Sequence, residues 1–259
     1  MYIHNLDPVL FNFGFLTIRW YSLAYIFGIL IGWWLAKKII SSKFNKSDLK
    51  FDIKEFDNLI TYLIISIIIG GRLGYVLFYN LNYYLSSPAD AFKIWQGGMS
   101  FHGALAGVVL GTYLFAKKKD IKLFLLLDVI ACVAPIGIFL GRIANFINGE
   151  LIGKPTNIFI GVIFPKIDNI VRHPSQLYEA FLEGLLLFII MIVMLLKKNY
   201  KIGTCSYMFL IFYGSFRIFS EFFREPDVQI GYLFNFISMG TALSTLMILA
   251  GIMISINKR

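Results

Sequence analysis

Residues 122–153 read KLFLLLDVIACVAPIGIFLGRIANFINGELIG. The first part of this stretch is apolar over the roughly 20 residues that a helix needs to cross about 30 Å of hydrocarbon. Its end then carries Arg142, Asn145, Asn148 and Glu150. The apolar run predicts a transmembrane helix, and its polar end raises the question of what such side chains do at the edge of a membrane.

The whole chain shares this apolar character. Its 259 residues are 58% hydrophobic and 17% aromatic, whereas soluble domains are about 45–50% apolar. Apolar runs long enough to span a membrane occur at 19–36, 58–80, 100–116, 122–141, 176–196, 203–222 and 231–256. We therefore predict an all-α polytopic membrane protein with seven transmembrane helices, built as a single integral-membrane domain over residues 1–259.

The lysines indicate which side each connector faces. If seven spans alternate, 14 of the 17 lysines fall on one side, in the connectors after spans one, three and five and in the C-terminal tail. The positive-inside rule assigns that side to the cytoplasm, which predicts an outward N-terminus and a cytoplasmic C-terminus. The net charge of +9 is then mostly a signal of topology and requires no nucleic-acid partner.

The arginines are distributed differently from the lysines. Six of the seven lie in the spans or on the outer side: Arg19, Arg72, Arg142, Arg172, Arg217 and Arg224. A planar guanidinium binds phosphate or carboxylate through two parallel hydrogen bonds. Charges at membrane depth are costly and are usually functional. The outer half of the bundle is therefore predicted to hold an anion.

The sixth span carries a ladder of polar residues. Tyr213, Arg217, Glu221 and Arg224 follow one another at spacings of 4, 4 and 3, which places them on one face of a helix. One interpretation is an internal ion-pair ladder. The other is an anion site, because two arginines against one glutamate leave a surplus positive charge.

Three further groups lie on the same outer side. His102 begins the third span and is either a structural residue or a base that accepts a proton. Segment 172–180 contains His173, Gln176 and Glu179, and Glu183 follows at helical spacing. Glu179 either pairs with an arginine or orients a substrate hydroxyl. The free N–H groups at the start of that helix, near Pro174, offer another anion contact.

The polar end of the fourth span has its own pattern. Arg142, Asn145 and Asn148 recur every third residue, and Gly149 allows a turn that redirects Glu150. This set is either an interfacial polar cap or a site for a hydroxylated, anionic lipid head group.

Other motifs favour packing. Glycines four residues apart in spans one, two and three predict close helix contacts. Cys132 and Cys205 lie in apolar runs and predict buried thiols, with no metal site or disulfide framework.

Several motifs resemble a known family when read in order along the chain. They are RWYSLAY at 19–25, FHGAL at 101–105, GRIANFINGELIG at 141–153, HPSQLYEA at 173–180 and YGSFRIFSEFFREPD at 213–227. Together they closely resemble the prolipoprotein diacylglyceryl transferases, and the longest of them is the most specific.

The resemblance implies a bacterial plasma (inner) membrane enzyme of seven spans with its active site toward the outer leaflet. Members transfer the diacylglyceryl group of phosphatidylglycerol to the lipobox cysteine thiol in the signal peptide of a preprolipoprotein. A thioether forms and glycerol phosphate is released. No metal or organic cofactor is implied.

The family motifs also imply residue roles in this sequence. Arg142 and Arg217 match the positions that bind phosphate and stabilise charge, and His102 matches a histidine proposed as the base. Further sensitive positions match Tyr21, Asn145, Glu150, Gly153 and Tyr213. The alternative function is an anion or lipid transporter with an outward-facing, arginine-lined site, although repeated halves and broken helices are not evident.

Overall fold

The computed structural model describes residues 2–14, 17–44, 56–226, 232–233 and 237–257. The chain divides into two compact units. Unit 1 comprises Met1–Ala36 and Ile130–Arg259, and unit 2 comprises Lys37–Val129. Residues 231 and 234–236, at the start of the predicted span 231–256, lie outside the described residues.

Unit 2 is built on two helices, α2 (Phe56–Phe78) and α4 (Phe101–Lys119), which pack against each other. Glycines line the contact, as predicted from their spacing. A Cβ atom added to Gly70 would lie 2.5 Å from the carbonyl oxygen of Gly103 and 2.9 Å from the Cα of Gly107. The backbones can approach this closely only because these positions have no side chain.

Between α2 and α4 lie a short helix, α3 (Leu81–Ser86), and two 3₁₀ turns, η2 (Pro88–Phe92) and η3 (Ile94–Gln96). The buried Arg72 of α2 holds this connector through its guanidinium. It donates to the backbone carbonyl groups of Ala91 at 2.8 Å, Asp90 at 2.8 Å, Lys93 at 3.2 Å, Gly98 at 3.1 Å and Gly97.

Arg72 therefore does not serve the anion site that the distribution of arginines predicts. Its N–H groups are directed at neutral carbonyl oxygens of its own connector. That bonding explains how an arginine is tolerated at this depth, because each buried donor has an acceptor.

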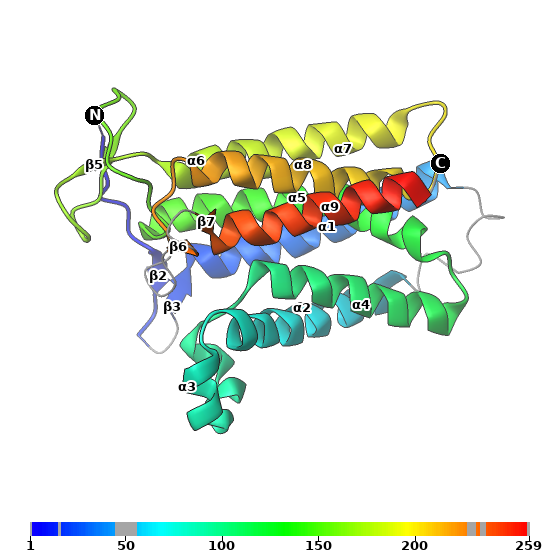
Figure 1. The fold of residues 1–259 in the computed structure, drawn as a ribbon, viewed down its shortest axis with the longest axis horizontal. Helices are drawn as coiled ribbons and strands as arrows, with labels where there is room; N and C mark the ends of the chain where they lie inside the picture. Colours follow the sequence, from blue (N-terminus) through cyan, green and yellow to red (C-terminus); the bar gives the residue numbers. More distant parts are fainter. Residues whose placement is uncertain (1, 15–16, 45–55, 227–231, 234–236, 258–259) are drawn as a thin grey trace. The chain divides into compact units, whose positions relative to one another are not determined.

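Unit 1 contains the remaining long helices (Figure 1): α1 (Trp20–Lys43, which continues into unit 2), α5 (Leu123–Asn148, which begins there), α8 (Thr204–Glu221) and α9 (Met239–Asn257). A further helical segment is composite. It starts as α6 (Ser175–Glu179), widens into a π-helix, η4 (Ala180–Leu186), and ends as α7 (Leu187–Leu196). A π-helical turn holds an extra residue and is frequent at functional sites.

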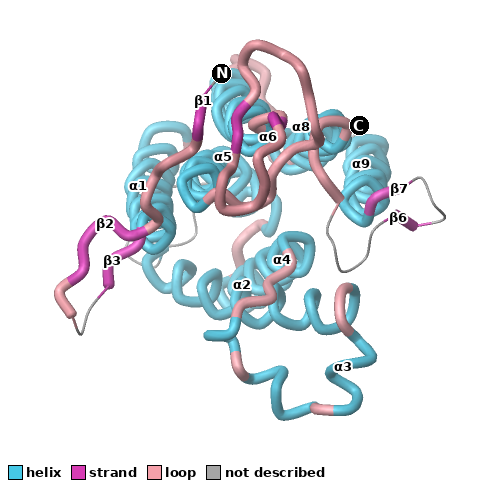
Figure 2. Tube along the Cα trace, turned by 90° about the vertical axis from the view of Figure 1, so that its left-hand side faces the viewer, coloured by secondary structure: helices cyan, strands magenta, loops and turns pink. Residues whose placement is uncertain are grey.

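The strands of unit 1 are short and lie near one end of its helices. A three-stranded sheet has the order β1 (Tyr2–Ile3), β4 (Val162–Ile163) and β5 (Val171–Arg172), with β1 parallel to β4 and β4 antiparallel to β5. Two hairpins pair β2 (Val9–Asn12) with β3 (Thr17–Arg19), and β6 (Tyr232–Leu233) with β7 (Ile237–Ser238). Figure 2 looks onto the end of the unit 1 helices at which β1 lies.

Five helical segments of the described chain are long and apolar enough to cross a membrane: Trp20–Lys43, Phe56–Phe78, Leu123–Asn148, Ser175–Leu196 and Met239–Asn257. The other two predicted spans coincide with α4 and α8, which are less apolar. Helix α4 ends on three lysines, and α8 carries Arg217 and Glu221. The protein is thus mostly helical and has the makeup of a polytopic membrane protein.

Candidate active site

The polar end of α5 is helical, and the turn that follows it is the one that the sequence predicts. The helix continues to Asn148, beyond the apolar run that ends at 141. Gly149 then adopts a φ of 68°, a conformation that is easy only for glycine. The turn brings Glu150 back to Asn145, whose Nδ2 donates to Glu150 Oε1 at 2.7 Å.

Three side chains from other segments hold this turn through its backbone. The Nε2 atom of His4 lies 2.7 Å from the carbonyl oxygen of Phe146. Gln176 donates to the carbonyl of Glu150 at 2.6 Å, and Ser175 donates to that of Leu151 at 3.0 Å. The N-terminal segment and the first turn of α6 therefore fix the direction in which the chain leaves α5.

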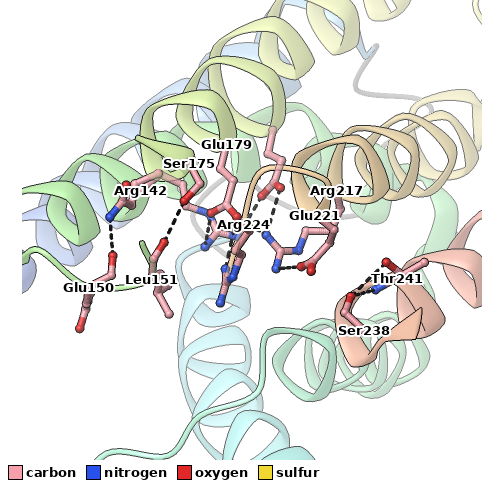
Figure 3. Close-up of polar contacts among 12 residues, drawn as sticks. Arg142, Glu150, Leu151, Ser175, Glu179, Arg217, Glu221, Arg224, Ser238 and Thr241 are labelled. Atoms are coloured by element: carbon pink, nitrogen blue, oxygen red, sulfur yellow. Dashed lines mark hydrogen bonds and ion pairs between the residues drawn. The ribbon is translucent and has the colours of Figure 1, made fainter. Parts of the chain in front are cut away.

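Glu179 is the centre of an ion-pair cluster (Figure 3). Its side chain is fully buried on α6, and arginines from α5, α8 and the segment after α8 converge on it. Glu179 Oε2 lies 2.9 Å from Arg142 Nη1. Glu179 Oε1 pairs with Arg217 Nη1 and lies 3.3 Å from Arg224 Nη1. The alternative that Glu179 pairs with an arginine is therefore the one observed.

Two further carboxylates complete the cluster. Glu183 Oε2, within the π-helix, lies 3.0 Å from Arg142 Nη2. Glu221 Oε1 pairs with Arg217 Nη2 one helical turn away on α8. Each of these two arginines thus has two close carboxylates, one on each Nη atom, and Glu183 Oε1 also lies 3.6 Å from Arg217 Nη1.

The expected surplus of positive charge is not found in this cluster. Three arginines meet three glutamates, so the formal charges balance when all six groups are ionised. The sequence-based expectation considered only the residues of the sixth span. It omitted Glu179 and Glu183, which come from another helix. Such compensation is expected, because an unpaired buried charge costs several kcal/mol.

Arg142 has more donors than its two ion pairs use. A guanidinium has five N–H donors, and the two ion pairs of Arg142 engage one donor on each Nη atom. The Arg142 side chain is also the most exposed of the three, at 14% against 8% for Arg217 and 7% for Arg224. Arg142 is therefore the most accessible of the three arginines.

Arg224 does not continue the helical ladder, contrary to the prediction. Helix α8 ends at Glu221, and Arg224 forms an antiparallel bridge with Gly153. Lys154 stabilises this end of α8, because its Nζ donates to the carbonyls of Phe222 at 3.1 Å and Glu221 at 3.4 Å. Arg224 reaches Glu179 from this extended segment.

Gly153 lies where three backbone segments meet. Its N–H donates to the carbonyl of His173 at 3.1 Å, and the next residue bonds to Phe223 at 2.8 Å. A Cβ atom on Gly153 would lie 2.6 Å from the Cβ of His173 and 2.8 Å from the carbonyl oxygen of Phe223. The need for glycine here is a matter of packing beneath the cluster.

His173 packs in an aromatic group with Tyr178 and Phe223. Its Nδ1 lies 3.2 Å from the Tyr178 hydroxyl. Burial and the nearby charge of Lys154 lower the pKa of His173 below its ordinary value. The imidazole is therefore neutral at pH 7 and serves chiefly to pack this junction.

Three other predicted residues lie on α8, α1 and α4. Tyr213 is buried one turn before Arg217 and stacks on Phe209, with ring centroids 5.7 Å apart. Tyr21, on α1, accepts a hydrogen bond from Tyr25 at 3.2 Å. His102 is the second residue of α4 and belongs to unit 2.

Buried acceptors near the cluster have no hydrogen-bond donor in the described part of the chain. Two of these atoms are Asn148 Oδ1 and Gln176 Oε1. An unsatisfied buried acceptor commonly indicates a bound water or ligand. Within the described residues, no group of His, Cys, Asp and Glu side chains could hold a metal ion.

Sequence reasoning gave two residues of this region no role in the site. Glu183 lies at helical spacing after Glu179, but no ion pair was assigned to it. His4 carried no signal, because its partner Phe146 is 142 residues away.

The fold and the site together define a class: a polytopic helical membrane protein that buries paired arginines and glutamates beneath a polar helix end. Residues 8–257 match the family described as prolipoprotein diacylglyceryl transferase. The chain belongs to this family of transferases, which confirms the resemblance seen in the motifs.

Similar curated proteins agree. A protein of Rickettsia bellii is 52% identical over 250 residues, covering 96% of this chain and 94% of the relative. One from Ehrlichia ruminantium is 51% identical over 255 residues and covers 96% of both chains. One from Rickettsia felis is 52% identical over 249 residues and covers 95% of both. Each is named phosphatidylglycerol–prolipoprotein diacylglyceryl transferase.

Proposed function

We propose that this chain transfers the diacylglyceryl group of phosphatidylglycerol to the lipobox cysteine thiol of preprolipoproteins. The observation that carries the proposal is the pair Arg142 and Arg217, each held by two carboxylates and joined through Glu179. Family membership and the names of the similar proteins support the same reaction.

The bond changes define what the site must do. The cysteine sulfur attacks the carbon of the diacylglyceryl group that is bonded to the phosphate oxygen. A C–S bond forms, and the bond between that carbon and the phosphate oxygen breaks. The electron pair leaves with glycerol phosphate, and the thiol proton passes to a base. The phosphodiester carries one negative charge and the departing monoester approaches two, so charge grows on the phosphate.

Arg142 and Arg217 would stabilise this growing charge. Donors fixed in advance stabilise a transition state more than the ground state, because they need no reorganisation as charge develops. The carboxylates of Glu179, Glu183 and Glu221 hold the two guanidinium groups in place. Because the charges of the cluster balance, the glutamates would serve mainly to position the two guanidinium groups, and the cluster would not attract every anion equally.

The thiol needs only modest activation, since the pKa of a free cysteine is about 8.5. We assign the base to His102, in the first turn of α4. Cys132 and Cys205 are buried and take no part, because the nucleophile arrives on the substrate.

The other candidate residues bind or shape the site. Amide and carboxylate groups would bind hydroxyls of the glycerol head group, and the two glycines shape the backbone around it. This set comprises Tyr21, Asn145, Asn148, Gly149, Glu150, Gly153, His173, Gln176, Tyr213 and Arg224. The unsatisfied acceptors Asn148 Oδ1 and Gln176 Oε1 suit such hydroxyl donors.

We also propose a single integral-membrane domain of seven spans in the bacterial plasma membrane, with the N-terminus outside, the C-terminus cytoplasmic and the site toward the outer leaflet. The lysine distribution supports this orientation. Strand β1 and the last residues of α9 also lie at opposite ends of the helices of unit 1 (Figure 1).

Incubation of the purified protein with phosphatidylglycerol and a lipobox peptide tests the reaction. Mass spectrometry should detect a diacylglyceryl adduct on the peptide cysteine together with released glycerol phosphate. A peptide with serine in place of the cysteine is the control and should give neither. Folded protein that forms no adduct with the cysteine peptide would overturn the proposal.

A further inference from the structure

We propose that Gly240 is a positioning residue for Arg217 and that it acts through Glu221. The inference rests on the proposed transferase function, because it concerns the arginine assigned to the phosphate. Gly240 is the second residue of α9, and sequence motifs did not single it out. Its position brings the first turn of α9 directly against the Arg217–Glu221 ion pair.

The contact leaves no room for a side chain. A Cβ atom at position 240 would lie 2.5 Å from Glu221 Oε1, 3.0 Å from Glu221 Cδ and 3.3 Å from Arg217 Nη2. Carbon and oxygen do not approach to 2.5 Å without a bond, so either α9 or the carboxylate would have to move.

The first turn of α9 is held in place. Ser238 accepts a hydrogen bond from the backbone N–H of Thr241 at 3.1 Å, and the two side-chain hydroxyls lie 3.0 Å apart (Figure 3). This is the arrangement of a helix N-cap, which fixes the entry of the chain into the helix. Farther along, α9 packs closely on α8, where Gly251 meets Tyr207 and Ile211.

Glu221 is also restrained from its own side. Its carboxylate pairs with Arg217, and Lys154 binds the backbone carbonyls of Glu221 and Phe222. The side chain of Glu221 is only 9% exposed. A carboxylate displaced by a new methyl group would therefore leave Arg217 instead of swinging freely into solvent.

The consequence for Arg217 follows from its two closest partners. Glu179 holds one Nη atom and Glu221 holds the other, which together set the plane of the guanidinium. If Glu221 is displaced, the guanidinium keeps its partners at Nη1, Glu179 and, at 3.6 Å, Glu183, and it can pivot about that atom. The first turn of α9 also places the positive end of a helix dipole near the Glu221 carboxylate. A displaced carboxylate would lose this favourable interaction.

A double-mutant cycle tests this chain of contacts. Gly240→Ala should lower kcat on the order of 10- to 100-fold, as expected when a catalytic group is misplaced, and should change the KM for phosphatidylglycerol much less. Glu221→Ala removes the atoms that a Cβ at 240 would strike. In that background, adding Gly240→Ala should cost less than about 3-fold in kcat, because the two changes act through one interaction.

Gly251→Ala is the matched control. A Cβ there would lie 2.9 Å from the carbonyl oxygen of Tyr207 and 2.8 Å from Ile211 Cγ1, so it disturbs the same α8–α9 contact away from the ion pair. It should lower the melting temperature and leave kcat per folded molecule unchanged. An equal loss of kcat in Gly251→Ala and Gly240→Ala would overturn the inference, as would an undiminished Gly240→Ala effect in the Glu221→Ala background.

Folding yield provides a second measurement. If Gly240→Ala does not fold, the clash with Glu221 is the expected cause, and the double variant with Glu221→Ala should recover monodisperse protein. A double variant that also fails to fold would contradict the assigned partner. An inactive wild-type protein would instead refute the proposed reaction, so the two failures are distinguishable.

Discussion

The two units bury arginine in different ways, and the comparison shows when a buried arginine indicates a site. In unit 2, Arg72 donates to five backbone carbonyls of one connector. In unit 1, Arg142 and Arg217 pair with carboxylates from two other helical segments and from α8 itself. Both arrangements satisfy the donors, but only the second gathers several charges where a ligand charge can be stabilised.

The kind of group that a buried arginine binds is thus more informative about its role than its burial is. Carbonyl acceptors from a contiguous loop make Arg72 a brace for local structure. Carboxylates from several helices make Arg142 and Arg217 members of a preorganised site, because their positions depend on the assembly of the whole unit.

The largest effect is expected at the centre of the cluster. Glu179→Gln leaves Arg142, Arg217 and Arg224 facing a neutral amide, and breaking a buried ion pair costs about 3–5 kcal/mol. We expect a large fall in the free energy of unfolding, measured by thermal or denaturant unfolding in detergent, and loss of transfer activity.

Glu183→Gln is the control for that change, because Glu183 lies 3.0 Å from Arg142 but 3.6 Å from Arg217, whereas Glu179 pairs with all three arginines. It should destabilise the protein less than Glu179→Gln. Equal losses in the two variants would contradict the central place given to Glu179.

A smaller loss of stability is expected at the brace of unit 2. Arg72→Lys removes the fork that reaches several carbonyls at once, and an unsatisfied buried acceptor costs about 1–3 kcal/mol. The melting temperature should fall while kcat per folded molecule is retained. Arg19→Lys, at an exposed position of β3, is the matched control and should change neither quantity.

The smallest effect concerns the ion pair between Asp168 and Arg172, 2.6 Å apart near the three-stranded sheet. Hydrogen bonds from Arg172 hold the pKa of Asp168 below its ordinary value. Since the folded pKa lies below the unfolded one, the stabilisation is present above the unfolded value of about 3.9 and is lost as pH falls through the folded value.

Thermal unfolding of the wild type and of Asp168→Asn measures this effect between neutral and strongly acidic pH. The wild type should melt higher at neutral pH, and the difference should shrink below about pH 4. A difference that stays constant across the range would exclude the Asp168 charge as its cause.

Local features of the fold and site were predictable from the sequence. The apolar run ending at 141 predicts a long helix, and the pattern of Asn145, Gly149 and Glu150 predicts the turn that follows it. Both depend on residues close in sequence, where spacing and backbone preferences decide the outcome.

Features that depend on several helices were not predictable. The charge balance of the cluster requires Glu179 and Glu183 to meet arginines 34 or more positions away, information that helical periodicity does not contain. The bridge between Arg224 and Gly153, which takes Arg224 out of the helical ladder, was unpredictable for the same reason. The π-helix that carries Glu183 likewise has no signal in a pattern of apolar residues.

The most direct test of the central claim compares two conservative substitutions in one transfer assay. Arg142→Lys keeps the charge but loses the planar fork, and removing a preorganised donor typically costs about 100- to 1,000-fold in kcat. We predict a loss of this size for Arg142→Lys, with normal insertion, and no loss per folded molecule for Arg72→Lys. Unchanged turnover in Arg142→Lys would show that the cluster takes no part in the chemistry.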